Sequence, residues 1–572
     1  MGSELPTIKL EHQDLNYGDY STSVAMVLAK ELKQSPVAVA KNIVSKLNET
    51  KSENILKVEM AGPGFINFYL KKEFFAKSIK DIIKAGDKFG QNSNLAGQKT
   101  IIEFTDPNPF KEFHIGHLMS NAIGESISRI IEAAGSKVIR VSYGGDIGLH
   151  VAKAIWGYRQ LERYLGENKS KIVIYEQERE IISHEKEASF WGLAYAFGAS
   201  EYDADAGHKI EIDELNKEMF FSITPETKKI YEQGRKVSIE HFQTIFKRLG
   251  TNFEHNFWES EVVGDAMKAV EEGLAKNILE KSEGAIIFKG ENYGLHTRVF
   301  VNSKGVPTYE AKELGLGVKK IELYNFDKSI IITGNEQNDY FKVLLTAIGL
   351  LRPQVKDKTT HIGHGMLRFT SGKMSSRKGN VITGVLLLEQ VQEIISEKMK
   401  ERNFSPAEKE TLAEIISVGA IKYSILRQAN GKDIIFDFDK SLSFEGDSGP
   451  YLQYSCVRAK AVLAKAKEAG IGGGLLSIFK KVEKFGAEVS ELEKVLYRFP
   501  EIVERAGSEY APHYLVTYLT DLAGKFNSYY AQNKIIDKGD KDSVYKVELT
   551  RAFAQTIENG LNLLGIRVPD KM

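Results

Sequence analysis

The stretch Glu103-Phe-Thr-Asp-Pro-Asn-Pro-Phe-Lys-Glu-Phe-His-Ile-Gly-His117 lies between a predicted strand and a predicted helix. Residues 100–104 are mostly apolar, which indicates a short buried strand, and the prolines that follow end it. A helix is predicted from near His114 to Gly135, because apolar residues recur there at helical spacing, and another strand is predicted at 138–141. Strand, helix and strand in this order indicate a parallel sheet covered by helices.

A second unit of the same kind occurs far downstream. A strand is predicted at 330–333, a loop at 334–339 and an apolar helix at 340–351. Residues 155–290 between the two units are mixed and charge-rich, so they are predicted to be an insertion. From about residue 411 onward the pattern is helical almost throughout. The fold class predicted from these patterns is α/β with a helical C-terminal part.

Residues 1–97 are predicted to form a small α/β unit of their own, which ends in a polar linker rich in Gly, Asn and Gln. Its predicted elements are helices at 22–32 and 37–47 and strands at 55–60 and 65–70.

Composition excludes several classes of protein. The 572 residues include 77 Lys and Arg, 77 Asp and Glu, and one cysteine, Cys456. Ordinary apolar, Gly and Pro contents exclude collagen-like, disordered and disulfide-scaffold chains. A single cysteine excludes a Cys-based structural zinc site and favours a reducing compartment. A net charge of zero does not exclude nucleic acid, because a local basic patch can bind phosphate.

No targeting or membrane segment is predicted. The first residues lack the apolar core of a signal peptide, and no stretch approaches the roughly 18 consecutive apolar residues of a membrane span. We therefore expect a cytoplasmic protein.

His114-Ile-Gly-His117 is predicted at a helix N-terminus, where exposed N–H groups and the helix dipole favour phosphate. Gly116 would leave room for a nucleotide base. The alternative is a chance tetrapeptide, and the chain spells the same four letters again at His361-Ile-Gly-His364. The second copy is not followed by a helical pattern, so we expect only the first to bind a nucleotide.

Ser371-Gly-Lys-Met-Ser-Ser-Arg-Lys-Gly-Asn380 is the second candidate segment. Lys373, Arg377 and Lys378 could bind a polyphosphate, although a solvated basic loop is the alternative.

Together the two segments resemble the HIGH and KMSKS motifs of class I aminoacyl-tRNA synthetases, and residues 103–117 look like the arginyl-tRNA synthetase form. Gly18-Asp-Tyr-Ser and Gly62-Pro-Gly-Phe-Ile-Asn67 are similar to that family's N-terminal tRNA-binding domain. Gly446-Asp-Ser-Gly-Pro-Tyr-Leu-Gln-Tyr454 is similar to its anticodon-binding domain.

The resemblance implies three domains. They are an N-terminal tRNA-binding domain at 1–97, a split Rossmann-type parallel-sheet catalytic domain at 98–385 and an all-α stem and anticodon-binding domain at 386–572.

The activity implied is the ATP-dependent ligation of L-arginine to tRNA(Arg) through an arginyl-adenylate, with release of AMP and diphosphate. ATP is then a substrate, Mg²⁺ is expected with it, and no zinc is expected. A monomer is expected.

The family's ATP-site positions fall on both segments. The resemblance implies catalytic roles for Lys111, His114, His117, Lys373 and Lys378, and ATP contacts from His114, Gly116, His117, Met366, Lys373, Ser375 and Ser376. Ser376 stands where the general KMSKS motif has its second lysine. Lys111, three residues ahead of His114, matches the lysine thought to compensate in arginyl enzymes. The alternative for Lys111 is an exposed residue at the helix entry.

Arginine recognition needs carboxylates, because a guanidinium is planar and permanently charged. The resemblance implies contacts to arginine from Glu103, Asp106, Asn108, Tyr309, Glu313 and Gln337. The family usually has aspartate where this chain has Glu313 and serine where it has Asp106. Without the resemblance, Glu313 would be a solvated helix residue.

In the C-terminal part, Tyr451, Tyr454 and Arg458 recur at three- and four-residue spacing, which places them on one helix face. With Met572, they match tRNA-binding positions of the family. Aromatic rings beside an arginine suit unstacked bases, although two tyrosines at this spacing also occur in helix cores.

Two rival functions are considered. A small-molecule nucleotidyltransferase also uses a His-Gly-His turn, but the long helical C-terminal part argues against it. A catalytically silent synthetase-like RNA-binding protein is the other alternative. The presence of Lys111, His114, His117 and Lys373 argues against it without settling the matter.

Overall fold

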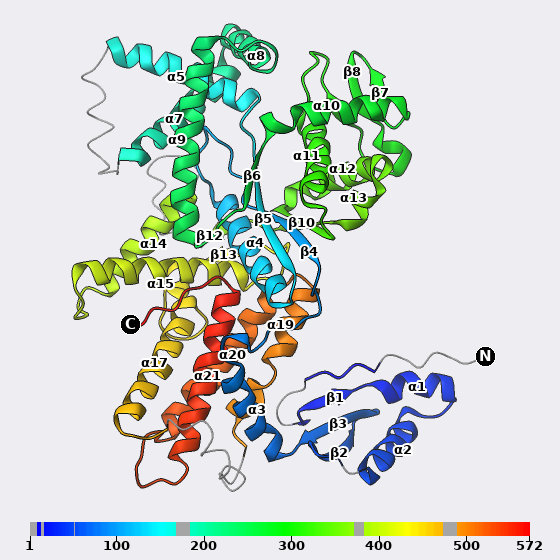
Figure 1. Cartoon of the computed structure of the whole chain (residues 1–572), viewed down its shortest axis with the longest axis vertical. Helices are drawn as coiled ribbons and strands as arrows, with labels where there is room; N and C mark the ends of the chain where they lie inside the picture. The colour runs from blue at the N-terminus through cyan, green and yellow to red at the C-terminus, as the bar shows by residue number, and fades with distance from the viewer. Residues whose placement is uncertain (1–7, 13–16, 51, 168–182, 371–382, 473–488) are drawn as a thin grey trace.

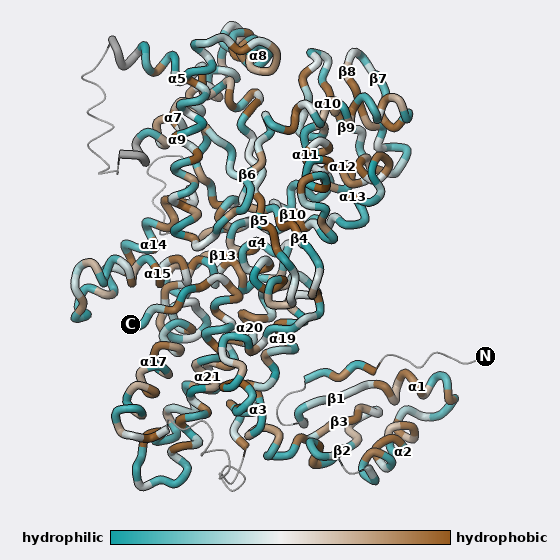
Figure 2. The backbone as a smooth tube through the Cα atoms, in the orientation of Figure 1, coloured by the Kyte–Doolittle hydropathy of each residue, from teal (hydrophilic) through white to brown (hydrophobic). Residues whose placement is uncertain are grey.

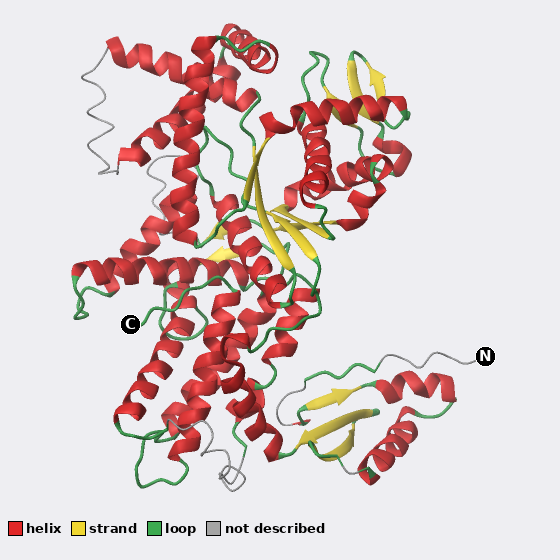
Figure 3. Cartoon of the chain, in the orientation of Figure 1, coloured by secondary structure: helices red, strands yellow, loops and turns green. Residues whose placement is uncertain are grey.

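Among the described residues, five parallel strands form the central sheet, in the order β11-β10-β4-β5-β6. Figure 3 shows the sheet in yellow among the red helices. The computed structural model describes residues 8–12, 17–50, 52–167, 183–370, 383–472 and 489–572. The strands are β4 (Lys99–Glu103), β5 (Lys137–Gly144), β6 (His255–Trp258), β10 (Lys328–Gly334) and β11 (Thr359–His364). Apolar residues concentrate in the three inner strands, β4, β5 and β10 (Figure 2), as strands buried on both faces require. The predicted parallel α/β sheet is confirmed.

Helices connect the parallel strands. α4 (Ile115–Ala133) joins β4 to β5, and α12 (Asn338–Leu351) with α13 (Pro353–Lys358) joins β10 to β11. The predicted helices at 114–135 and 340–351 are confirmed. In α4, only Ile115, Gly116, Arg129 and Glu132 are not buried. The helix therefore lies inside the molecule and not on one face of it.

The range 155–290 divides at β6, which pairs with β5 in the central sheet. Before β6, four helices pack around Trp156 and Trp191. They are α5 (Leu149–Glu167), α7 (Ser183–Ala204), α8 (Ala206–Phe221) and α9 (Pro225–Leu249).

The chain after β6 forms a separate group on the other side of the sheet (Figure 1). It comprises α10 (Glu259–Ala275), the antiparallel strands β7 (Glu280–Ser282), β8 (Ala285–Phe288) and β9 (Arg298–Val301), and α11 (Tyr309–Tyr324).

The N-terminal unit contains a three-stranded antiparallel sheet, in the order β1-β3-β2, and two helices. Its elements are β1 (Tyr20–Thr22), α1 (Val24–Leu32), α2 (Pro36–Glu49), β2 (Ile55–Ala61) and β3 (Phe65–Leu70). The predicted helices and strands are confirmed, and β1 is additional. The next helix, α3 (Lys72–Ala85), packs on two helices of the C-terminal part, α18 (Glu491–Leu496) and α21 (Ser543–Leu563). The Tyr20 hydroxyl donates a 2.5 Å hydrogen bond to Glu501, which ties this unit to the C-terminal part.

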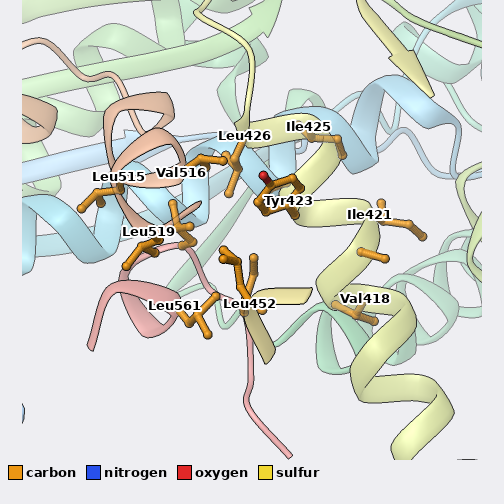
Figure 4. Packing of buried hydrophobic residues seen from close by; sticks show 14 of the residues in the cluster. Val418, Ile421, Tyr423, Ile425, Leu426, Leu452, Leu515, Val516, Leu519 and Leu561 are labelled. Carbon is orange, nitrogen blue, oxygen red and sulfur yellow. The ribbon is translucent and has the colours of Figure 1, made fainter. Parts of the chain in front are cut away.

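The C-terminal part is helical, as predicted, apart from β13 (Ile434–Phe436), which pairs with β12 (Leu367–Phe369). Its helices are α14 (Gly384–Lys398), α15 (Pro406–Leu426), α16 (Phe438–Ser441), α17 (Gly449–Glu468), α18 (Glu491–Leu496), α19 (Phe499–Ser508), α20 (His513–Gln532) and α21 (Ser543–Leu563). Figure 4 shows apolar side chains of α15, α17, α20 and α21 meeting in one core, which also includes the apolar residues of α4.

Polar bonds join α4 to the end of α21. The Ser126 hydroxyl donates to the carbonyl of Leu563 at 3.1 Å, and the Arg129 guanidinium donates to the side-chain oxygen of Asn562 at 2.6 Å. Nearby, Lys422 is 1% exposed. Its side-chain nitrogen donates to the carbonyls of Leu249 and Gly565 at 2.6 and 2.8 Å. Burial lowers the pKa of Lys422 to about 7. The ends of α9 and α21 are thus held together beside α4.

The contact between Gly124 of α4 and Phe104, the residue after β4, predicts the effect of one substitution. A Cβ on Gly124 would lie 2.2 Å from Cγ of Phe104, a ring that is 0% exposed. We expect Gly124→Ala to lower the free energy of unfolding by about 1–3 kcal/mol through overpacking, although alanine favours helix. Gly264→Ala in α10 is the matched control, because a Cβ there meets nothing within 4 Å. Urea unfolding measures both, and equal effects of the two substitutions would contradict this packing.

Candidate active site

The turn between β4 and α4 has an unusual backbone. Thr105 and Asp106 have φ values of 79° and 48°, and Phe110 has 68°, all in the left-handed region that non-glycine residues rarely adopt. Buried hydrogen bonds hold this conformation: the Thr105 N–H donates to the Ser120 hydroxyl at 3.0 Å, and the Phe110 N–H donates to that of Ser238 at 2.9 Å. Backbone strain held in this way is typical of functional loops.

His114 and His117 lie at the N-terminus of α4. The backbone N–H of His114 donates to Nδ1 of His117 at 3.2 Å, and the two rings stack with their centroids 3.5 Å apart. Because Nδ1 of His117 accepts, a neutral ring carries its proton on Nε2. Burial first, and then the positive charge of Lys111, lower the pKa of His114, whereas burial, His114 and Lys111 lower that of His117. Both rings are therefore neutral near pH 7.

Lys111 lies close to both histidines. Its ammonium is 4.7 Å from the ring centroid of Tyr195, on α7, and its charge lowers the pKa of both rings. It also contributes to the low pKa of His150, which burial brings to about 3. One lysine therefore carries positive charge beside the N-terminus of α4, where the helix dipole already favours an anion.

The second basic segment, Ser371 to Asn380, lies wholly outside the described residues. Lys373, Ser375, Ser376 and Lys378 are therefore not described. The chain is described again from Thr383, which forms an antiparallel bridge with His114. The next N–H, of Gly384, donates to the carbonyl of Phe113 at 2.7 Å. The chain that follows the segment therefore lies against the N-terminus of α4. Met366, which precedes the segment, donates its backbone N–H to the side chain of Asp433 at 2.9 Å. Met366 is 55% exposed.

The second copy of the tetrapeptide is strand and not helix, as its context predicted. His361 and His364 belong to β11, and His364 pairs with Gly334 of β10 at the carboxyl end of the sheet. His364 is nonetheless close enough to His114 to lower its pKa. The sequence did not indicate this proximity, because it depends on β11 lying beside β10.

A group of buried carboxylates lies beyond the histidines. Glu103 pairs with Lys320 and Glu259 pairs with Lys312, and all four side chains are at most 4% exposed. Burial, and then the charge of Glu103, raise the pKa of Glu313 to about 8 and also raise that of Asp106. This part of the site is therefore short of positive charge.

Backbone groups position two of the predicted residues. Asp106 accepts the N–H of Tyr143 at 2.7 Å, and the side-chain oxygen of Asn108 accepts the N–H of Gly145 at 2.8 Å. Both donors lie at the end of β5, so the turn after β4 is fixed to the neighbouring strand. Gln337 directly precedes α12.

Tyr309 begins α11 and is 56% exposed, and the ammonium of Lys312 lies 4.5 Å from its ring centroid. The sequence analysis missed Glu259, Lys312 and Lys320. Nothing in the sequence distinguishes Lys320 from its partly exposed neighbour Lys319, because only the fold shows which side chain turns inward.

Asp146 connects the sheet to the surrounding helices. Its carboxylate is 0% exposed and accepts from the backbone and hydroxyl of Ser260, at 2.9 and 2.8 Å, and from Arg235 at 2.9 Å. The Tyr231 hydroxyl donates to the same carboxylate at 3.1 Å. The bonds fix β5, α9 and the start of α10 to one another, and so fix the carboxylate group at the sheet edge.

A second candidate site lies in the C-terminal part. Tyr451, Tyr454, Arg458 and Met572 all line one cavity of about 410 Å³. The structure thus brings together four residues that the sequence analysis selected, although their binding role stays a prediction.

The fold and both sites define the class of the protein. Residues 78–438 match the family described as tRNA synthetases class I (R), catalytic domain. Residues 452–572 match the DALR anticodon binding domain, and residues 1–70 match the arginyl tRNA synthetase N terminal domain. The chain is therefore a class I aminoacyl-tRNA synthetase in its catalytic part. With the other two domains in this order, it belongs to the arginyl-tRNA synthetase family.

Individual relatives agree. The Arginine–tRNA ligase of Clostridium kluyveri is 30% identical over 97% of this chain and 94% of its own length, and that of Clostridium perfringens is 30% identical over 95% and 92%. Among solved structures, the arginyl-tRNA synthetase of Thermus thermophilus aligns with a TM-score of 0.77 at 22% identity, covering 99% of this chain and 96% of its own. That of Plasmodium falciparum aligns with 0.75 at 20%, covering 99% and 95%. These structures share the fold.

The described residues contain no helix that is both long and apolar enough to cross a membrane. They also contain no group of three or more His, Cys, Asp and Glu side chains placed to hold a metal ion.

Proposed function

We propose that this chain joins L-arginine to tRNA(Arg) with ATP, through an arginyl-adenylate. The observation that carries the proposal is the match to the arginyl family along the whole chain. In the first step the arginine carboxylate attacks the α-phosphorus, and the bond to the β-phosphate breaks to release diphosphate. In the second step a hydroxyl of the tRNA's terminal adenosine attacks the activated carbonyl, and AMP leaves.

A carboxylate is already a nucleophile at pH 7, so the first step needs no general base. Catalysis then consists of holding the reactants in line and stabilising charge on the phosphates. His114 and His117 are neutral beside the N-terminus of α4, where His117 is buried and His114 is exposed, and each can donate one N–H to a phosphate oxygen. Lys111 supplies the positive charge beside them, and Gly116 supplies open backbone for the base.

Lys373 and Lys378 are proposed as further phosphate contacts, and Ser375, Ser376 and Met366 as further ATP contacts. Mg²⁺ is proposed to accompany ATP on its phosphate oxygens.

The arginine side chain is proposed to bind at the carboxylates near the carboxyl ends of the parallel strands. Glu313 provides the carboxylate for the guanidinium, Tyr309 covers it, and Gln337 contacts it from the start of α12. Asn108 and Asp106 hold the other end of the amino acid. Glu103 is paired with Lys320 and 2% exposed, so its proposed role is to keep this end of the pocket negative.

The cavity of the C-terminal part is proposed to bind an anticodon base, with Tyr451, Tyr454, Arg458 and Met572 as its contacts. We further propose a cytoplasmic monomer. The domain limits proposed remain 1–97, 98–385 and 386–572.

Pyrophosphate exchange tests the function. The full chain should exchange labelled diphosphate into ATP in the presence of arginine and tRNA(Arg), and should charge that tRNA. Exchange driven by another amino acid would overturn the substrate assignment. Binding of tRNA without exchange or charging would favour the silent RNA-binding protein, the alternative that no observation here supports.

The position of Lys111 predicts a rate effect. We expect Lys111→Ala to lower kcat for exchange by about 10²–10³-fold, because a charge that stabilises the phosphates is lost, with the KM for arginine changed less than threefold. Lys153→Ala is the matched control, because Lys153 also lies over a tyrosine, Tyr202, at 4.0 Å. A Lys111→Ala enzyme with normal turnover would remove Lys111 from the mechanism.

The raised pKa of Glu313 predicts a pH effect. With a pKa of about 8, Glu313 is protonated below pH 8 in the free enzyme, whereas a guanidinium binds its ionised form. The Kd for arginine should therefore fall up to about tenfold per pH unit between pH 6 and 8, and level off above. Calorimetric titration at several pH values measures it.

Glu313→Gln should bind arginine weakly and without this slope, because glutamine does not titrate. Glu322→Gln, at an exposed position of the same helix, should behave as the wild type. A flat Kd in the wild type from pH 6 to 8 would show that Glu313 is ionised before arginine binds.

A further inference from the structure

The cavity of the C-terminal part contains a residue that the sequence did not select. Asn527, on α20, lines it together with Tyr451 and Arg458 of α17. The remaining lining includes Lys398, Arg402 and Met572. Asn527 hydrogen-bonds to both Arg458 and Tyr451, which makes it the polar link between two proposed base contacts.

The orientation of the Asn527 amide follows from chemistry alone. The Arg458 guanidinium lies 2.5 Å from one atom of the amide, and a guanidinium can only donate hydrogen bonds. The atom facing Arg458 must therefore be the amide oxygen, Oδ1. The amide nitrogen, Nδ2, then faces Tyr451 and Ser455, each at 2.9 Å.

The hydrogen atoms on this side can all be assigned. The Ser455 hydroxyl donates to the backbone carbonyl of Tyr451 at 2.8 Å, so its oxygen accepts from one hydrogen of Nδ2. The other hydrogen of Nδ2 goes to the phenol oxygen of Tyr451. That oxygen accepts from Asn527, so its own O–H points elsewhere. Within the described residues it has no other hydrogen-bond partner, and Tyr451 lines the cavity.

Arg458 is held on its other sides by aromatic rings. Its guanidinium carbon lies 4.7 Å from the ring centroid of Tyr454 and 5.5 Å from that of Tyr530. Rings and amide together restrict the guanidinium to one position, which a flexible side chain would otherwise not keep.

We infer that Asn527 is a positioning residue, which turns the Tyr451 hydroxyl into a donor aimed at a hydrogen-bond acceptor of the bound tRNA nucleotide. The acceptor is a carbonyl oxygen or ring nitrogen of a base, because these are the acceptors on base edges. The inference deepens the proposed function, since it rests on the cavity being a tRNA site.

Asn527→Asp reverses the hydrogen bond with little change of shape. A carboxylate accepts only, so the Tyr451 hydroxyl would turn and donate to it, while Arg458 would keep its partner. The Kd of the full chain for a tRNA(Arg) transcript, measured by filter binding, should rise about tenfold in Asn527→Asp and about tenfold in Tyr451→Phe. In the double variant, Tyr451→Phe should add less than twofold, because the donor is already lost.

This cycle separates positioning from simple repulsion of RNA by the new charge. Repulsion would raise the Kd but leave the full effect of Tyr451→Phe in the Asn527→Asp background. Asn533→Asp is the charge control, because it makes the same change from amide to carboxylate at the end of the same helix, α20. It should not reduce the effect of Tyr451→Phe. The Kd for arginine should be unchanged in every variant.

Independent effects in the cycle, or no effect of either single variant, would overturn the inference. The readout is binding, so a wild-type chain that binds tRNA but does not charge it would refute the proposed function while the cycle still tests Asn527.

Discussion

The burial of α4 fixes both the position of the two histidines and the contact between the central sheet and the C-terminal helices. Its N-terminus presents the two histidines at the sheet edge, while its remaining length packs on β4, β5 and β10 and on the helices α14, α15, α19 and α21. A helix buried on every side cannot shift without moving several neighbours, because protein interiors are close-packed. The histidines are therefore placed by contacts that extend far beyond the nucleotide site.

Buried contacts also set the charge of the proposed arginine pocket. Two buried lysines neutralise Glu103 and Glu259, which leaves Glu313 and Asp106 to balance a substrate cation. Without that cation, burial, and then the charge of Glu103, raise the pKa of Glu313. The equal numbers of acidic and basic residues in the chain conceal a local separation of charge. Lys111 provides positive charge where phosphates are proposed to bind. The carboxylates provide negative charge where arginine is proposed to bind.

The sequence predicted the parallel sheet, the long helix after His114 and the helical C-terminal part, because each follows from local periodicity. It also selected Tyr451, Tyr454, Arg458 and Met572, which line one cavity. It did not indicate β6 within the charge-rich range, because His255-Asn-Phe-Trp258 begins with two polar residues and lacks the mostly apolar run of the strands at 138–141 and 330–333. It also missed Lys312, Lys320 and Asn527, whose partners lie on other elements, so that only the tertiary fold determines their surroundings.

The bonds between α4 and the end of α21 join residues far apart in the chain, since Ser126 and Leu563 are separated by 437 positions. During synthesis, α4 leaves the ribosome long before its partners do. The apolar residues of α4 that face α15, α19 and α21 are exposed in the nascent chain until those helices have been made and have docked. The helix that carries the histidines is therefore translated before these partner helices and is enclosed only after they have docked.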